Sequence, residues 1–146
     1  MNKQWAYLSF FGYLLCFAAQ ASQQVEIITS DQFPITGINQ LKQTGVHVRL
    51  YNLDDPKRLL NQFKQGLSPA NKLEQNKAAM MRRFNALGKK SLQQQFSKAY
   101  QGVVVGTQYR ITRYPVILFD QGASAIYGVT HLPDAWALYQ QSREQR

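Results

Sequence analysis

The chain has 146 residues, with 17 Lys and Arg against 8 Asp and Glu, which gives a formal net charge of +9. This length suffices for one domain with a core formed by apolar burial. Cys16 is the only cysteine, so a domain that follows it has no disulfide, thiolate nucleophile or cysteine metal ligand. The charge favours acidic partners, namely anionic lipid, nucleic acid or acidic proteins, and the alternative is a role in solubility alone.

Residues 1 to 21 have the pattern of an export signal. Lys3 provides a positive start, residues 5 to 19 are almost wholly apolar, and Ala19-Gln20-Ala21 matches the small-x-small pattern of a cleavage site. The apolar run of about fifteen residues is shorter than the roughly 20 that a membrane-spanning helix needs. We therefore predict cleavage near Ala21 and an exported domain over residues 22 to 146. The alternative is an uncleaved anchor.

A strand, a helix and a second strand are predicted at the start of this domain. Residues 25 to 29 are β-branched and mostly apolar, which favours a buried strand. A helix is expected over residues 35 to 43, and Gly45 suits its C-terminal cap. Residues 46 to 51 alternate with period two, which predicts a half-exposed strand. The expected core positions are Ile38 and Leu41 in the helix, and Val46, Val48 and Leu50 on one face of the strand.

A long helical region follows. Asp55 and Pro56 are typical of an N-cap and a first helical residue, and this helix is expected to stop near Gly66. Ser68-Pro69 repeats the start signal, and residues 68 to 108 are predicted to form a helical insert with a break at residues 88 to 91. The alternative for the three valines at 103 to 105 is a short strand.

The segment around Pro115 is the most informative part of the chain. Proline suits the first residue of a strand, so a buried strand is predicted over residues 116 to 119, and Tyr114–Pro115 is the best candidate for a cis peptide bond. A turn at residues 120 to 123 and a strand at 124 to 128 complete a hairpin. Thr130 is expected to cap a last helix, with Leu132, Ala135, Trp136 and Tyr139 on one face.

The predicted order is β-α-β-α-β-β-α with the helical insert between the second and third strands, which indicates an α/β sandwich. This order and the Pro115 segment resemble the thioredoxin fold. Thioredoxins carry a Tyr-Gly-Ile-x-x-hydrophobic-Pro run before an apolar strand and a Gly turn. Here Tyr109, Ile111, Tyr114, Pro115 and Gly122 occupy matching places, with Arg110 where the glycine would stand. The redox Cys-x-x-Cys would fall at residues 32 to 35, where there is no cysteine, so redox chemistry is not expected.

The chain also resembles a family of small exported proteins encoded in integrating conjugative elements, which accompany the type IV secretion apparatus. The run from Ile111 to Pro115, Phe119-Asp120 and the run from Ile126 to Thr130 carry this resemblance, together with residues 99 to 103. It implies a periplasmic thioredoxin-like component of conjugative DNA transfer. It implies no enzymatic activity.

Catalytic and metal sites are not predicted. His47 and His131 are the only histidines and fall in separate elements, whereas a metal site needs several ligands with supporting partners. Asp54 and Asp55 are the only acidic pair, and the sequence has no nucleophile elbow and no glycine-rich phosphate loop. We therefore expect a non-enzyme without a metal or cofactor.

Two surfaces are candidates for binding. The thioredoxin resemblance implies a groove in which the residue before the proline pairs with an extended peptide. Its residues would be Phe33, Pro34, Arg113, Tyr114 and Pro115, with Arg113 favouring an acidic or C-terminal group. The alternative is that Tyr114 and Pro115 only fix the start of the strand and the aromatic rings pack locally.

The second surface is basic and lies in the helical insert. It would face acidic partners, lipid or nucleic acid, or be an ordinary solvated face. Its residues are Lys77, Arg82, Arg83, Lys89, Lys90 and Lys98. The expected function is a non-catalytic periplasmic component of a conjugative transfer system that binds other proteins of the apparatus. The alternative is a basic periplasmic protein that binds DNA or an anionic membrane surface.

Overall fold

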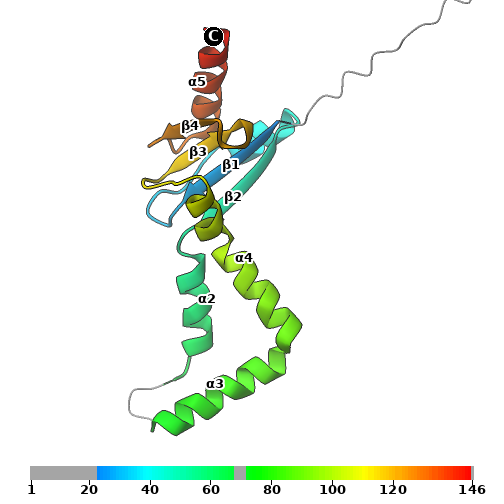
Figure 1. The fold of residues 1–146 in the computed structure, drawn as a ribbon, viewed down its shortest axis with the longest axis vertical. Coiled ribbons are helices and arrows are strands. Elements are labelled where there is room, and N and C mark those ends of the chain that lie inside the picture. The colour runs from blue at the N-terminus through cyan, green and yellow to red at the C-terminus, as the bar shows by residue number, and fades with distance from the viewer. Residues whose placement is uncertain (1–22, 68–71, 146) are drawn as a thin grey trace, which may run out of the picture.

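The computed structural model describes residues 23–67 and 72–145. Four strands, β1 (Gln24–Thr29), β2 (His47–Asn52), β3 (Val116–Phe119) and β4 (Ser124–Tyr127), form one sheet in the order β2-β1-β3-β4 (Figure 1). β1 and β2 are parallel, β3 is antiparallel to β1, and β4 is antiparallel to β3. The predicted α/β class is therefore confirmed.

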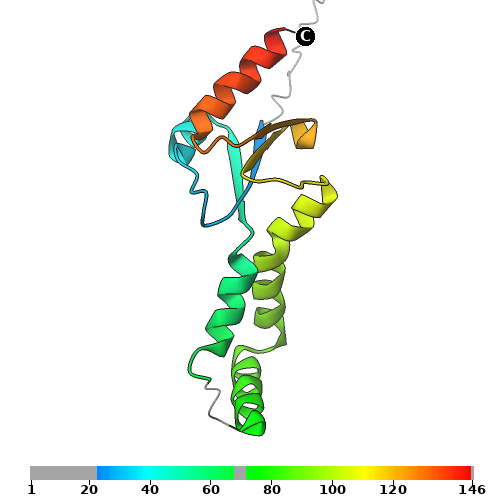
Figure 2. The same ribbon diagram turned by 90° about the vertical axis from the view of Figure 1, so that its left-hand side faces the viewer.

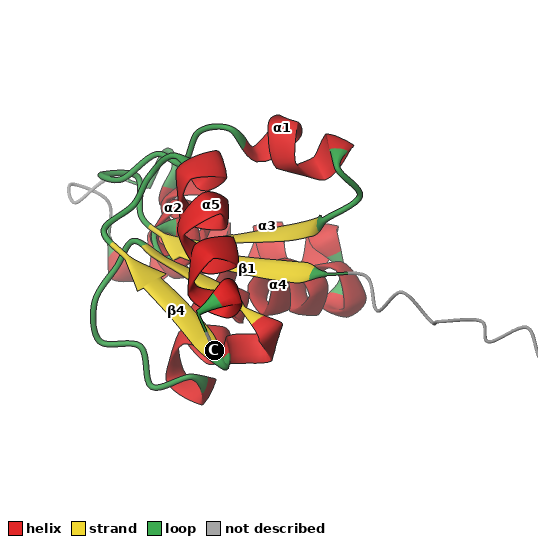
Figure 3. Cartoon of the chain, turned by 90° about the horizontal axis from the view of Figure 1, so that it is seen from above, coloured by secondary structure: helices red, strands yellow, loops and turns green. Residues whose placement is uncertain are grey.

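Helices α1 (Ile38–Gln43) and α5 (Leu132–Glu144) cover one face of the sheet. Figure 3 views the molecule from the end that carries α5. The core on this face contains Ile27 of β1, Phe119 of β3 and Tyr139 of α5. The rings of Phe119 and Tyr139 are stacked with their centroids 4.3 Å apart. As predicted, Leu132, Ala135 and Tyr139 of α5 are buried and Trp136 packs against them.

The C-terminal half of α4 (Lys89–Gln108) covers the opposite face. Ile28, Val116 and Leu118 are buried there and pack against side chains such as Val105 of the helix. Gly102 allows a close approach, because a Cβ atom at this position would lie 3.0 Å from the Cβ of Tyr51. The three valines at 103 to 105 lie within α4, so they belong to a helix, as expected, and not to a strand.

The described parts of residues 55 to 100, which we call the helical arm, extend beyond one end of the sheet (Figures 1 and 2). The arm contains α2 (Asp55–Lys64), α3 (Leu73–Leu87) and the N-terminal half of α4. Phe63 holds the three helices together, with its ring 5.1 Å from Phe84 of α3 and 5.8 Å from Phe96 of α4. The predicted break lies at Gly88, whose φ of 74° ends α3.

The structure corrects the predicted ends of three helices. α1 begins at Ile38 and not at residue 35, because Thr36 pairs with His131 and Gly37 has a φ of 76°. α2 already includes Asp55, so its N-cap is Asp54. Thr130 does not cap α5, because the N-cap position is occupied by His131; the Thr130 carbonyl instead accepts the N–H of Thr36 at 2.8 Å.

The expected burial of β2 is wrong at one position. Val46 is buried and Val48 is half-buried against the α1–α5 core, but Leu50 on the same face is 48% exposed. Tyr51 on the other face is buried instead, because α4 passes close to it. β2 is an edge strand covered partly from both sides.

Some predictions concern residues outside the described ranges. The export signal over residues 1 to 21 and the helix start at Ser68-Pro69 are among them. Within residues 23–67 and 72–145, no helix combines the length and apolar character that crossing a bilayer requires.

Candidate binding groove beside Tyr114 and Pro115

The groove lies where the loop after β1 meets the segment that leads into β3. Tyr114–Pro115 is a cis peptide bond, as predicted. The rings of Phe33 and Tyr114 meet edge to face with centroids 6.1 Å apart. The loop of Phe33 is held by its own strand, since Thr29 Oγ1 donates a hydrogen bond of 2.5 Å to the Phe33 carbonyl. Two of the predicted groove residues therefore do lie side by side.

An open cavity of about 370 Å³ adjoins Tyr114 between the C-terminal half of α4 and β1. Its walls are mainly apolar. Gly102 and Gly106 of α4 carry no side chain, so this part of the helix leaves space instead of filling it. The principal apolar side chains that line the cavity are Ile28, Leu53, Val103, Ile111 and Tyr114.

The backbone beside this cavity is available for pairing. Within the described residues, the N–H and C=O groups of Thr112, Arg113 and Tyr114 form no hydrogen bond. The segment is nevertheless fixed at its start, because Ile111 N–H donates to the Gly106 carbonyl at 2.8 Å. Exposed backbone groups without partners beside an apolar cavity are the arrangement that binds an extended peptide by strand addition.

Arg113 and Pro34 are not among the residues that line the cavity. The guanidinium carbon of Arg113 lies 5.9 Å from the centroid of the Tyr127 ring in β4, which places its charge on the β4 side. Pro34 is exposed in the loop after Phe33. The sequence did not indicate Val103, Gly102 or Gly106, although two glycines four residues apart on one helix face are a signal of close approach or open space.

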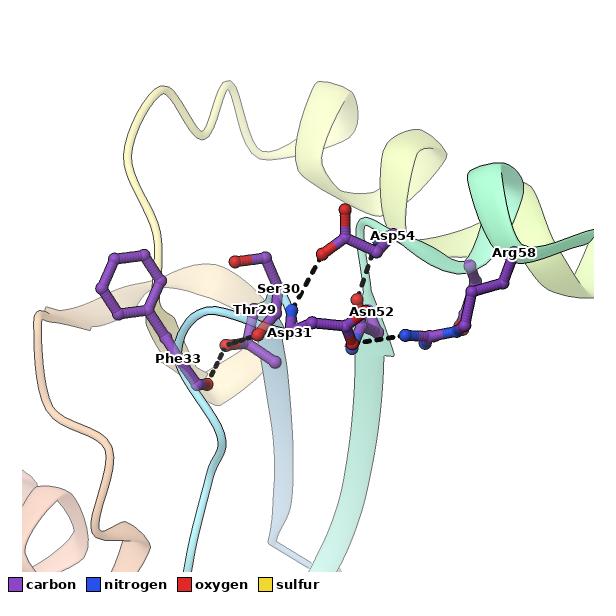
Figure 4. Close-up of polar contacts among 8 residues, drawn as sticks. Thr29, Ser30, Asp31, Phe33, Asn52, Asp54 and Arg58 are labelled. Atoms are coloured by element: carbon purple, nitrogen blue, oxygen red, sulfur yellow. Dashed lines mark hydrogen bonds and ion pairs between the residues drawn. The ribbon is translucent and has the colours of Figure 1, made fainter. Parts of the chain in front are cut away.

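A polar network joins the sheet to the helical arm at the ends of β1 and β2 (Figure 4). The Asp31 carboxylate accepts hydrogen bonds from Arg58 and from Asn52 Nδ2, the latter at 2.8 Å. Asp31 N–H donates to the Asp54 carboxylate at 2.8 Å. The hydrogen bond from Arg58, followed by that from Asn52, lowers the pKa of Asp31 from its ordinary value. This network fixes the direction in which α2 leaves the sheet.

Ser30 lies between this network and the loop of Phe33. Its Oγ is buried and, among the residues that the structure describes, has no hydrogen-bond partner. A buried hydroxyl without a partner is destabilising, because it has lost water and gained nothing in exchange.

The predicted basic residues lie on different parts of the helical arm. Lys77, Arg82, Lys89 and Lys90 are exposed on α3 and at the start of α4. Arg83 is half-buried and donates a hydrogen bond to the Phe63 carbonyl, so it joins α3 to α2. Lys98 lines a shallow cavity of about 300 Å³ together with Asp55 and Arg58.

The histidines lie in separate elements. His47 is exposed on β2, and His131 Nδ1 lies 2.9 Å from the Asp134 carboxylate at the start of α5. Among residues 23–67 and 72–145, no three His, Cys, Asp or Glu side chains are grouped closely enough to hold a metal ion.

A family model described as "Protein of unknown function (DUF1525)" matches residues 22–145. The chain belongs to the DUF1525 family. The match extends over the residues that form the sheet, the groove and the helical arm. No curated protein and no solved structure shows significant similarity to the chain.

Proposed function

We propose that the protein is an exported, non-catalytic binding module with a thioredoxin-like fold. Its role would be in a conjugative DNA-transfer (type IV secretion) system of an integrating conjugative element, where it binds an extended segment of another apparatus protein in the periplasm. The fold part is supported by the sheet order β2-β1-β3-β4 and by the strand directions. The placement of α1 and α5 on one face and α4 on the other supports it further.

The observation that carries the binding function is the unpaired backbone of residues 112 to 114 beside the apolar cavity. A partner strand gains main-chain hydrogen bonds from Tyr114 and its neighbours, and one of its side chains enters the cavity. The volume of about 370 Å³ accommodates a large aliphatic or aromatic side chain. We therefore expect the bound segment to be extended, with an apolar residue facing α4.

The cellular part of the proposal has separate support. Export is supported by the signal-like pattern of residues 1 to 21, and the link to conjugation by the resemblance of the segments around Pro115 and Tyr127. A non-catalytic role agrees with the make-up of the groove, which offers apolar side chains and backbone groups for binding.

Two neighbouring valines of α4 give a matched test. Val103 lines the cavity and is 42% exposed, whereas Val104 is 62% exposed and does not line it. A photoreactive amino acid at position 103 is expected to cross-link one protein of the transfer apparatus in donor cells that carry the element. The same amino acid at position 104 is the control and is expected to give little of that product.

The functional consequence is measured with Val103→Asp and Val104→Asp. A carboxylate in the cavity would lose its hydration when an apolar side chain enters, which is unfavourable. Val103→Asp is therefore expected to lower the frequency of element transfer, while Val104→Asp leaves it unchanged. Equal transfer by the two variants at equal protein level, or equal cross-linking at both positions, contradicts the groove function. Flanking genes without secretion or relaxase functions contradict the conjugative role alone.

A further inference from the structure

Almost all the excess charge of the chain is concentrated in the helical arm. Residues 55 to 100 contain ten Lys and Arg but only two Asp and Glu, while the rest of the chain contains seven and six. The arm extends away from the sheet, and α3 lies at its far end (Figures 1 and 2). The net charge of the protein is therefore presented at one end of the molecule.

α3 also exposes apolar side chains. None of its fifteen residues is fully buried, and only one side of the helix, with Met80 and Phe84, packs against the cluster around Phe63. Leu73 is 80% exposed and Met81 is 52% exposed. Leu73, Lys77 and Met81 are spaced four residues apart and so form one strip along the helix. The strip alternates aliphatic and cationic side chains.

We propose that α3 binds the surface of an anionic phospholipid membrane. Lysine and arginine contact the lipid phosphates there, while Leu73 and Met81 enter the boundary between headgroups and acyl chains. The exposed aliphatic side chains favour lipid over nucleic acid, because contacts to phosphates of DNA would leave Leu73 and Met81 unused. A second copy of the chain is disfavoured, because two arms of the same strong positive charge repel each other.

This contact leaves the groove free, because α3 lies at the end of the arm that is remote from the sheet (Figure 1). The protein would then contact the membrane through α3, with the sheet and the groove at the opposite end of the arm (Figure 1). Membrane binding is independent of the proposed groove function, so either one can fail without the other.

The test measures amide hydrogen exchange of the whole chain with vesicles of phosphatidylcholine, alone or mixed with phosphatidylglycerol. We expect slower exchange in Leu73–Leu87 on the mixed vesicles only, and loss of this protection at high salt. All variants carry the same N-terminal residues, so any contribution of that segment to vesicle binding is common to them. Equal protection of α3 on both kinds of vesicle overturns the proposal.

Two pairs of variants separate the apolar and the ionic contributions. Leu73→Ser combined with Met81→Ser is expected to abolish the protection of α3. Leu50→Ser combined with Leu138→Ser removes two exposed leucines from β2 and α5 and is expected to leave it unchanged. Lys77→Gln and Arg82→Gln are each expected to weaken vesicle affinity about five-fold at low salt. The matched control is Lys42→Gln in α1, which is expected to have little effect.

Duplex DNA is the competitor that tests the other anionic partner. If the Leu73→Ser, Met81→Ser variant binds mixed vesicles as tightly as the parent chain, the surface is a general polyanion site and the proposal is wrong. The same conclusion follows if DNA displaces the parent chain from vesicles at phosphate concentrations equal to those of the lipid. Retention on the vesicles under that competition supports the proposal.

Discussion

Replacement by alanine is expected to affect stability differently at the two glycines of α4 that line the cavity. Gly102 and Gly106 lie one turn apart in the same helix, and both are buried. A Cβ atom at Gly106 would have one neighbour within 4 Å, Ile28 Cδ1 at 3.9 Å, which is an ordinary van der Waals contact. A Cβ atom at Gly102 would lie 3.0 Å from Tyr51 Cβ, which is attached directly to the backbone of β2 and cannot rotate away.

The magnitudes follow from helix propensity and packing. Replacing glycine by alanine inside a helix stabilises it by about 1 kcal/mol, and this gain is the same at both positions. At Gly106 nothing opposes it, so Gly106→Ala is expected to raise the free energy of unfolding by about 1 kcal/mol. At Gly102 the close contact costs about 1–3 kcal/mol, so Gly102→Ala is expected to be neutral or to destabilise by up to about 2 kcal/mol.

Chemical denaturation of both variants beside the parent chain measures this difference. The expected separation between the two variants is about 1–3 kcal/mol in the free energy of unfolding, with Gly106→Ala the more stable. Gly106→Ala also narrows the cavity and is expected to weaken cross-linking from position 103 despite its greater stability. Stabilisation of the same size by both substitutions would refute the close approach of α4 to β2.

Three further substitutions test individual polar groups. Ser30→Ala removes a buried hydroxyl without a partner and is expected to raise the free energy of unfolding by about 1 kcal/mol in urea denaturation; a loss of stability would reveal an unrecognised partner. Tyr139→Phe removes the 2.6 Å hydrogen bond that the phenol donates to Asp120 and is expected to cost about 1 kcal/mol at neutral pH. Burial, followed by that hydrogen bond, raises the pKa of Tyr139 above its ordinary value of 10.0. The Tyr139 phenol therefore loses its proton at a lower pH in the unfolded chain than in the folded chain, so its stabilising effect is complete below pH 10 and is lost as pH rises above 10. Tyr139→Phe should make the alkaline fall in the free energy of unfolding less steep, and an unchanged fall counts against this account of Tyr139. The pKa of Asp31 is lowered chiefly by the hydrogen bond from Arg58, so the stabilising effect of the Asp31 carboxylate is present above pH 3.8, its ordinary pKa, and is lost as pH falls below that value. Arg58→Gln is expected to raise the pKa of Asp31 in an NMR titration. An unchanged pKa would exclude the ion pair in solution.

The sequence predicted elements well where one local signal dominates. Pro115 marks the start of β3, and four apolar residues make that strand unambiguous. Gly88 marks the end of α3, because the backbone there has a positive φ that glycine adopts readily and other residues do not. Helix starts were predicted less well, since the capping groups have distant partners. Asp54 accepts the N–H of Asp31, and the Thr130 carbonyl accepts that of Thr36, and neither pairing is visible locally.

The same distinction applies to the groove. The thioredoxin resemblance placed Phe33 and Tyr114 on opposite sides of one groove, because it brings their two loops together. The edge-to-face contact of their rings corresponds to the alternative, in which the aromatic rings pack locally. The cavity was not predicted, because its walls come from three places that are far apart in sequence: β1, Leu53 just after β2, and α4. Burial of Leu50 was expected from alternation alone, but alternation does not show how far α1 extends over β2.

The groove and the membrane surface are predicted to act independently, and this is itself open to test. Val103 lies on the part of α4 that covers the sheet, whereas Leu73 and Met81 lie on α3 at the far end of the arm. Sites this far apart, without shared contacts, give additive effects. Val103→Asp should therefore leave the vesicle protection of α3 intact, and the Leu73→Ser, Met81→Ser variant should still cross-link from position 103 in solution. Loss of both activities in either variant would show that the arm and the groove form one binding surface.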